Sequence, residues 1–179
     1  MSALRLSNQT HFPAYFVISR GQQIIARLPN LNAGASAEIP TQQVFNVTAS
    51  TIINGATLTT AAQNFEGAAG FLAQVRQNIR EGHLEFELIS VPPRQPNQVQ
   101  FQKTSLAPVS FTLSANNHYL QTVVVSNSYQ LISLDLADTY SIYAVINGVT
   151  TEPVSTSDPS AAIDAVVDSA DGFFQLRLA

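Results

Sequence analysis

The chain has 179 residues, of which 45% are hydrophobic and 11% charged, and Ser, Thr, Asn and Gln together supply 58 residues. Cysteine is absent, which excludes disulfide bonds, thiolate metal ligands and cysteine nucleophiles. The formal net charge is −4 and Lys103 is the only lysine, so nucleic acid is excluded as a partner because too few cations are present to follow a phosphate backbone.

The N-terminal half is predicted to form mainly β-strands. Residues 13–19 give the first clear strand, and residues 45–49 give another because their apolar side chains alternate with polar ones. Asn54 and Gly55 follow as a tight hairpin turn, since this pair suits positive backbone φ angles. Residues 68–79 predict a short helix before the closing strand of residues 82–88. The helical spacing is that of Ala68, Leu72, Val75 and Ile79.

The C-terminal half repeats this order of elements. Residues 108–114 match residues 13–19 and residues 140–144 match residues 45–49, both at an offset of 95. The hairpin turn at residues 147–148 and the closing strand at residues 172–178 also have counterparts, at offsets of 93 and 90. A second short helix is predicted where Asp158 is placed to cap it and Pro159 to begin it. The drift in offset indicates small deletions in loops.

These patterns predict a mainly β chain with two tandem duplicated domains. Each is an antiparallel β-sandwich-like domain of about six strands, with a short helix before the last strand. The first domain covers residues 1–91 and the second covers residues 99–179. Residues 92–98 form a proline-rich linker, because proline favours extended structure and lacks a backbone donor. The alternative is that unrelated β-rich segments share the same alternation.

The expected location is the cytoplasm. The first residues lack the apolar stretch of a secretory signal, and no run approaches the ~20 apolar residues of a transmembrane segment. Release by lysis or by a non-classical route is the alternative.

No recognisable set of residues predicts catalysis or metal binding. His11, His83 and His118 lie in separate settings, without a spacing that brings two imidazoles to one metal. Glu85 and Glu87 share a strand face, as a glycosidase pair does, but that face is expected in solvent. Four aspartates near the C-terminal end match no EF-hand spacing: the second and third would lie one helical turn apart and the last is expected in a turn, with calcium binding as the alternative. They are Asp158, Asp164, Asp168 and Asp171. We expect no enzyme activity, no cofactor and no metal.

Two predicted loops combine an aromatic ring with hydrogen-bonding side chains. Tyr119 follows Asn116 and Asn117, and Tyr129 follows Asn127. Sugar-binding sites use such rings as stacking platforms, with amide groups nearby. These five residues are the predicted ligand-binding residues, and the alternative is that they only complete turns.

Together these features predict a non-enzymatic structural or self-assembling protein of the capsid-like, fibre-like or inclusion-forming kind. A surface with few charges opposes self-association weakly, so the expected partner is a second copy of the chain in a homo-oligomer. The alternative is a binding module that attaches to a glycan or a host surface in a lectin-like or toxin-like way, with two copies giving bivalence. An enzyme is the least supported class, because no nucleophile, base and orienting group can be named.

Overall fold

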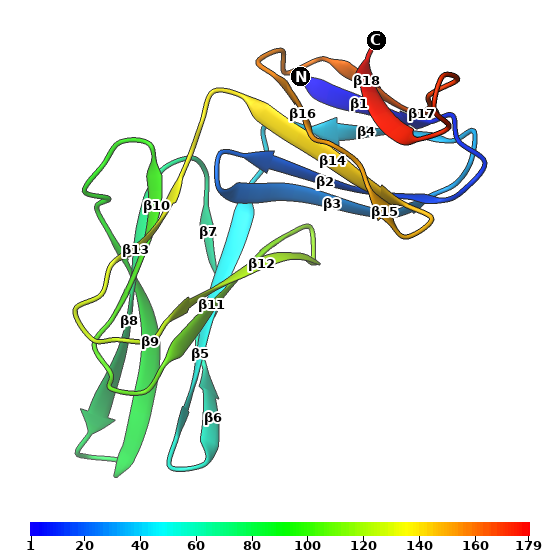
Figure 1. Ribbon diagram of the computed structural model, residues 1–179. Helices are drawn as coiled ribbons and strands as arrows, with labels where there is room; N and C mark the ends of the chain where they lie inside the picture. The colour runs from blue at the N-terminus through cyan, green and yellow to red at the C-terminus, as the bar shows by residue number, and fades with distance from the viewer. The chain divides into compact units, whose positions relative to one another are not determined.

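The computed structural model describes residues 1–179, and its regular elements are all β-strands. The strands form two compact units, which are described separately. Unit 1 consists of Met1–Gln43 and Ala137–Ala179, and unit 2 is the continuous stretch Val44–Leu136. In Figure 1, unit 1 combines the blue strands with the yellow, orange and red ones, whereas unit 2 runs from cyan through green to yellow-green.

Unit 1 contains two sheets. One has the strand order β18-β17-β1-β4, and the other has the order β15-β14-β2-β3 with β16 also paired to β14. β1 and β17 are parallel, and the other pairs are antiparallel. The strands are β1 (Ala3–Asn8), β2 (Ala14–Arg20), β3 (Gln23–Leu31), β4 (Ser36–Pro40), β14 (Tyr140–Ile146), β15 (Val149–Thr150), β16 (Val154–Thr156), β17 (Ala162–Val167) and β18 (Phe174–Leu178).

Unit 2 also contains two sheets. One has the order β13-β10-β8-β9, with β8 and β10 parallel, and the other has the order β12-β11-β5-β6 with β7 also paired to β5. The strands are β5 (Phe45–Ile53), β6 (Ala56–Thr59), β7 (Gln63–Phe65), β8 (Ala69–Asn78), β9 (His83–Val91), β10 (Gln98–Lys103), β11 (Val109–Ala115), β12 (His118–Val125) and β13 (Ile132–Asp135).

The two units have the same pairing pattern, with corresponding strands nine places apart in chain order. The register of β2 against β3 shifts between Ile18 and Ser19, and that of β11 against β12 shifts between Leu113 and Ser114, which lie 95 residues later. Two corresponding strands therefore carry the same irregularity at matching positions.

A buried threonine also occupies the same place in each unit. The Ala49 N–H donates to Thr60 Oγ1 at 3.0 Å, and the Ala144 N–H donates to Thr151 Oγ1 at 3.0 Å. In each unit the threonine N–H also donates to the carbonyl oxygen of its partner alanine. The likeness between the units therefore extends to single hydrogen bonds.

This division of the chain differs from the predicted tandem domains of residues 1–91 and 99–179. β1–β4 pair with β14–β18, and β5–β9 pair with β10–β13, so each unit combines strands from both halves of the sequence. Residues 92–98, the predicted linker, lie inside unit 2 and lead from β9 to β10, which flank β8 on either side. Local patterns predict strands but not their partners, because strand pairing is decided by long-range contacts.

Both predicted helices are wrong. Residues 68–79 contain β8, in which Phe71 and Ala73 are buried at strand spacing with the half-buried Leu72 between them. The second helix is replaced by β17, and Asp158 accepts a hydrogen bond from the Ser160 N–H at 2.9 Å in a turn. The helical spacing over residues 68–79 arose because short apolar runs fit both periods.

The cores lie between the paired sheets. In unit 2, five phenylalanine rings form a continuous series across the two sheets, with neighbouring centroids 5.0–6.0 Å apart. They are Phe45, Phe65, Phe71, Phe101 and Phe111. The core of unit 1 is mainly aliphatic. Its fully buried large side chains are Leu4, Leu6, Phe16, Ile18, Ile142, Ile146 and Ile163.

Candidate functional site

The predicted ligand-binding residues lie at opposite ends of β12. Asn116 and Asn117, with φ angles of 51° and 62°, form the turn before this strand, and Tyr119 lies near its start. Asn127 and Tyr129 lie in the loop after it. A strand of this length, at about 3.3 Å per residue, keeps the two groups apart. A ligand site at either place stays a prediction.

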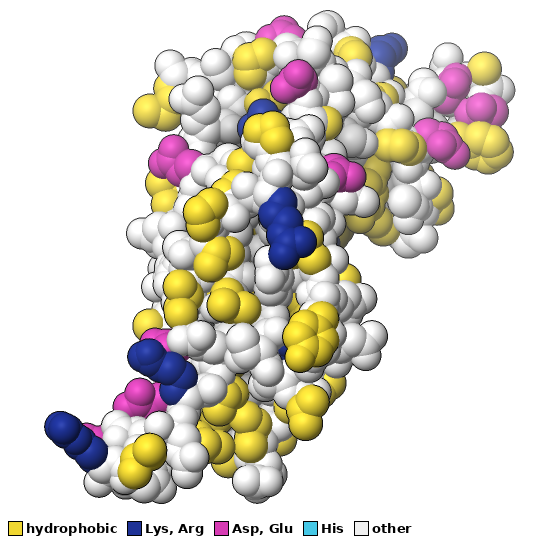
Figure 2. All heavy atoms as spheres, turned by 90° about the vertical axis from the view of Figure 1, so that its left-hand side faces the viewer, with side chains coloured by type: hydrophobic (Ala, Val, Ile, Leu, Met, Phe, Trp, Pro, Cys, Tyr) yellow, Lys and Arg dark blue, Asp and Glu magenta, His cyan; other side chains and the backbone are white.

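An apolar, open groove of about 420 Å³ lies at one end of unit 2, and its lining carries no charged residue. Two hairpins and a loop meet there. The lining residues are Ile52, Ile53 and Asn54 of the β5–β6 hairpin, Val75 and Leu84 of the β8–β9 hairpin, and Ser105, Leu106 and Ala107 of the β10–β11 loop. Figure 2 shows hydrophobic side chains gathered in the lower part of the view, at this end of unit 2. This size and composition are typical of small-molecule sites.

Longer hairpins build the walls of the groove. The β5–β6 ladder has four residue pairs, whereas the corresponding β14–β15 ladder has two. The β8–β9 ladder extends three pairs beyond Val75 and Phe86, while the β17–β18 ladder ends at the matching pair, Val167 and Phe174. Ile52 and Leu84, which line the groove, lie in the added lengths. Both hairpins of unit 2 are therefore longer than their counterparts in unit 1.

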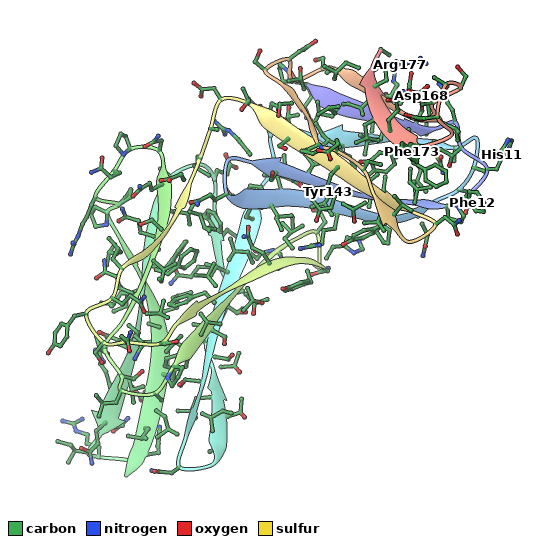
Figure 3. The ribbon with its side chains drawn as sticks, viewed as in Figure 1. His11, Phe12, Tyr143, Asp168, Phe173 and Arg177 are labelled. Atoms are coloured by element: carbon green, nitrogen blue, oxygen red, sulfur yellow. The ribbon has the colours of Figure 1, made fainter.

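At one matching position the two units carry different residues, and this difference leaves the groove open. In unit 1 the β1–β2 loop places the ring of Phe12 edge-on against Phe174, with centroids 5.9 Å apart and planes at 86°. Figure 3 shows Phe12 at the right-hand end of unit 1, together with Phe173. The position 95 residues after Phe12 is Ala107, which lines the groove. A ring thus covers this end of unit 1, and a methyl group takes its place in unit 2.

A buried lysine holds the loop that carries the groove residues. Lys103 ends β10 with 4% of its surface exposed, and its Nζ donates to the carbonyl oxygens of Ser105 at 2.6 Å and Leu106 at 3.3 Å. Burial lowers the pKa of Lys103 below its usual value. In unit 1 the matching residue, Asn8, is also buried and donates from Nδ2 to the carbonyl oxygen of Phe12 at 2.7 Å. A buried donor therefore fixes the same loop in both units.

Three metal-ligating side chains meet on the exposed β8–β9 hairpin. His83 Nε2 lies 3.3 Å from Glu81 Oε2 and 3.8 Å from Glu85 Oε1. The ligand atoms of all three lie within 4.8 Å of one another, close enough to hold a metal ion. The same distances also fit surface ion pairs, which explain the grouping without a ligand.

The four aspartates considered for calcium serve separate local contacts. Asp158, Asp168 and Asp171 each accept a hydrogen bond from the backbone N–H two residues further on, at 2.8–2.9 Å. Asp164 instead accepts a hydrogen bond from the Ser7 hydroxyl at 2.5 Å. Three of the four therefore stabilise turns, whereas the sequence predicted a turn for Asp171 alone.

The groove residues were not among the predicted site residues, because none of them is chemically distinctive. A signal for them is present in the sequence comparison of the two halves. Phe12 aligns with Ala107, and the change in offset from 95 to 90 falls at the longer hairpins.

Comparisons with known proteins give no relative for this chain: no family model, curated protein or solved structure matches it. The structure also contains no helix of the length and apolarity needed to cross a membrane.

Proposed function

We propose that this protein is a non-enzymatic structural protein that assembles with copies of itself through unit 1. The observation that carries this proposal is that unit 1 is built from two separate segments, Met1–Gln43 and Ala137–Ala179, with the whole of unit 2 between them in the chain. A unit built in this way can also be completed by the corresponding segment of a second chain, which is the basis of domain swapping.

The contact between the two segments is extensive enough to join chains. β2 pairs with β14 over seven residues, from Ala14 to Arg20, and β1 pairs with β17 over four. Phe16, Ile18 and Ile142 in the first of these pairs are fully buried. An exchanged unit would keep every one of these contacts, so the cost of exchange lies in the connections at residues 41–44 and 136–139.

The surface composition supports the same function. With 11% charged residues against about 25% in a typical protein, the chain has little charge repulsion to keep copies apart. Its most deeply buried cation, Lys103, is engaged with two backbone carbonyls and serves a structural role.

We also attribute the matching units to a duplication in which the two copies have exchanged strands. The shared pairing pattern, the matching register shifts and the two equivalent threonines support this origin. A protease site inserted in residues 92–97 of the full chain tests the exchange. After cleavage the two fragments should stay together, because each unit holds strands from both; two separate folded fragments would show a tandem arrangement instead.

Engineered disulfides test assembly directly, because the chain has no cysteine. Ser19 and Ser141 lie opposite each other in β2 and β14, so Ser19→Cys/Ser141→Cys joins the two segments of unit 1. After refolding at rising concentration, we expect a growing band of covalent dimer on a non-reducing gel and scattering masses above 19.3 kDa.

The matched control is Ser110→Cys/Val124→Cys, a pair opposite each other in β11 and β12 of unit 2. Both cysteines lie in one continuous stretch, so this pair should give only an internal cross-link at every concentration. A monomeric mass together with only internal cross-links for the unit 1 pair would refute the proposed assembly.

A second candidate function, that of a binding module, is favoured by the groove of unit 2. Its ligand class is argued below.

A further inference from the structure

The end of unit 1 shows what lies at this place when a ring is present. There the chain supplies a phenyl ring, Phe12, which packs edge-on against Phe174 of β18 and keeps 41% of its surface exposed. The β18 position corresponds to Phe86 of β9, because Phe174 pairs with Val167 as Phe86 pairs with Val75. The aromatic partner is therefore retained in unit 2, while the covering ring is replaced by Ala107.

The groove has the volume and lining for such a ring. Its volume is about 420 Å³, and a cavity of about 150 Å³ left by shortening a core side chain is enough to bind benzene. Ile53 and Val75 line the groove from the two sheets, and Leu106 extends from the rim with 91% of its surface exposed. The room beyond a single ring fits a bicyclic aromatic group.

The ligand should carry no charge. All eight lining residues are uncharged, and their polar side chains are those of Asn54 and Ser105. The nearby ammonium of Lys103 donates to two backbone carbonyl oxygens below the loop. An ionised ligand would lose its hydration without gaining an opposite charge, whereas a neutral ring loses only contacts with water.

We propose that the groove of unit 2 is a binding site for a small, uncharged aromatic compound, whose ring takes the place that Phe12 fills in unit 1. This site is independent of the strand exchange proposed for assembly, because it lies wholly within the continuous unit 2.

Two substitutions that exchange the residues of the units test this proposal. Ala107→Phe supplies the missing ring and should lower indole affinity by about tenfold or more, as measured by titration calorimetry and NMR shifts. Phe12→Ala is the matched control in unit 1 and should leave the stoichiometry of indole binding at one, because the shorter β14–β15 and β17–β18 hairpins do not supply the walls of the groove. Hexanol, an aliphatic probe, should bind more weakly than indole to the unaltered chain.

Several results would overturn the proposal. These are unchanged indole binding in Ala107→Phe, no indole binding to the unaltered chain at millimolar concentration, and hexanol binding equal to that of indole. Loss of self-association in Ala107→Phe, seen by light scattering without any effect of indole, would show that a second chain occupies the groove. If Phe12→Ala does not fold, the Ala107→Phe titration and the hexanol comparison still decide the matter.

Discussion

Unit 1 and unit 2 reach the same strand pairing by different routes along the chain. Unit 2 is one continuous stretch, whereas unit 1 is assembled from two segments on either side of it. Unit 1 is also covered at the end where Phe12 packs on Phe174, whereas unit 2 has a groove there. The comparison shows that the same pairing of strands is compatible with different chain connectivity and with different loops at this end of the unit.

The largest expected effect comes from emptying matched core positions. Phe16 of β2 and Phe111 of β11 are both fully buried and lie 95 residues apart. Each substitution to alanine should lower the free energy of unfolding of its own unit by about 3–5 kcal/mol, since it leaves a cavity. Hydrogen exchange resolved by residue measures the two units separately. For Phe16→Ala we expect unit 2 to keep its protection, and its loss in both units would show that they do not unfold independently.

The equivalent threonines give a sharper comparison. Thr60→Val and Thr151→Val each leave a buried alanine N–H without its acceptor, at Ala49 or Ala144. Each should lower the free energy of unfolding by about 1–3 kcal/mol, measured by urea denaturation. If one loss exceeds the other by more than about 2 kcal/mol, the two hydrogen bonds are not equivalent.

A glycine marks a place where the units differ. A Cβ added at Gly70 would lie 2.5 Å from the Val91 carbonyl oxygen and 3.4 Å from the Pro93 nitrogen, so Gly70→Ala should cost about 1–3 kcal/mol of stability. Its counterpart by register is Ala162, whose replacement by glycine should cost only about 0.5–1 kcal/mol. Thermal denaturation of both variants compares them, and a neutral Gly70→Ala would mean that residues 91–93 move aside readily.

The smallest expected effect is a pH dependence from Lys103. Burial lowers its pKa in the folded chain below the usual 10.5, so between the two values the unfolded chain binds more protons. The free energy of unfolding should therefore rise with pH across that window. Lys103→Met removes this rise. Subtracting the free energy of unfolding of the variant from that of the wild type at each pH removes the contribution of tyrosine ionisation, which both share. A difference that is flat from pH 7 to about 10.5 would contradict the lowered pKa.

The sequence was informative where local structure is decided by a short pattern, either an alternation of apolar residues or a turn residue. The alternation of Tyr140, Ile142 and Ala144 is confirmed as β14, and Asn54 and Asn147 have the positive φ angles expected of their turns. Residues 68–79 were misassigned because their few apolar side chains fit a helical spacing as well as the strand spacing of Phe71, Ala73 and Val75.

The pairing of strands and the groove were beyond the reach of sequence patterns. β5 and β2 have similar alternation, and nothing local to either decides that β5 pairs with β11 while β2 pairs with β14. The groove depends on the absence of a ring at Ala107, and an alanine in a loop is unremarkable until its counterpart, Phe12, is seen in the other unit.

The split of unit 1 has a consequence for how the chain is made. β1–β4 leave the ribosome first, but their partners, β14–β18, follow only after all of unit 2. At about 5–20 residues per second, translation of residues 44–179 takes on the order of 10 s. During this interval unit 2 can fold while the earlier strands wait with unpaired edges. Neighbouring ribosomes on one messenger RNA hold several such strands close together, so translation itself provides an occasion for one nascent chain to capture the strands of another.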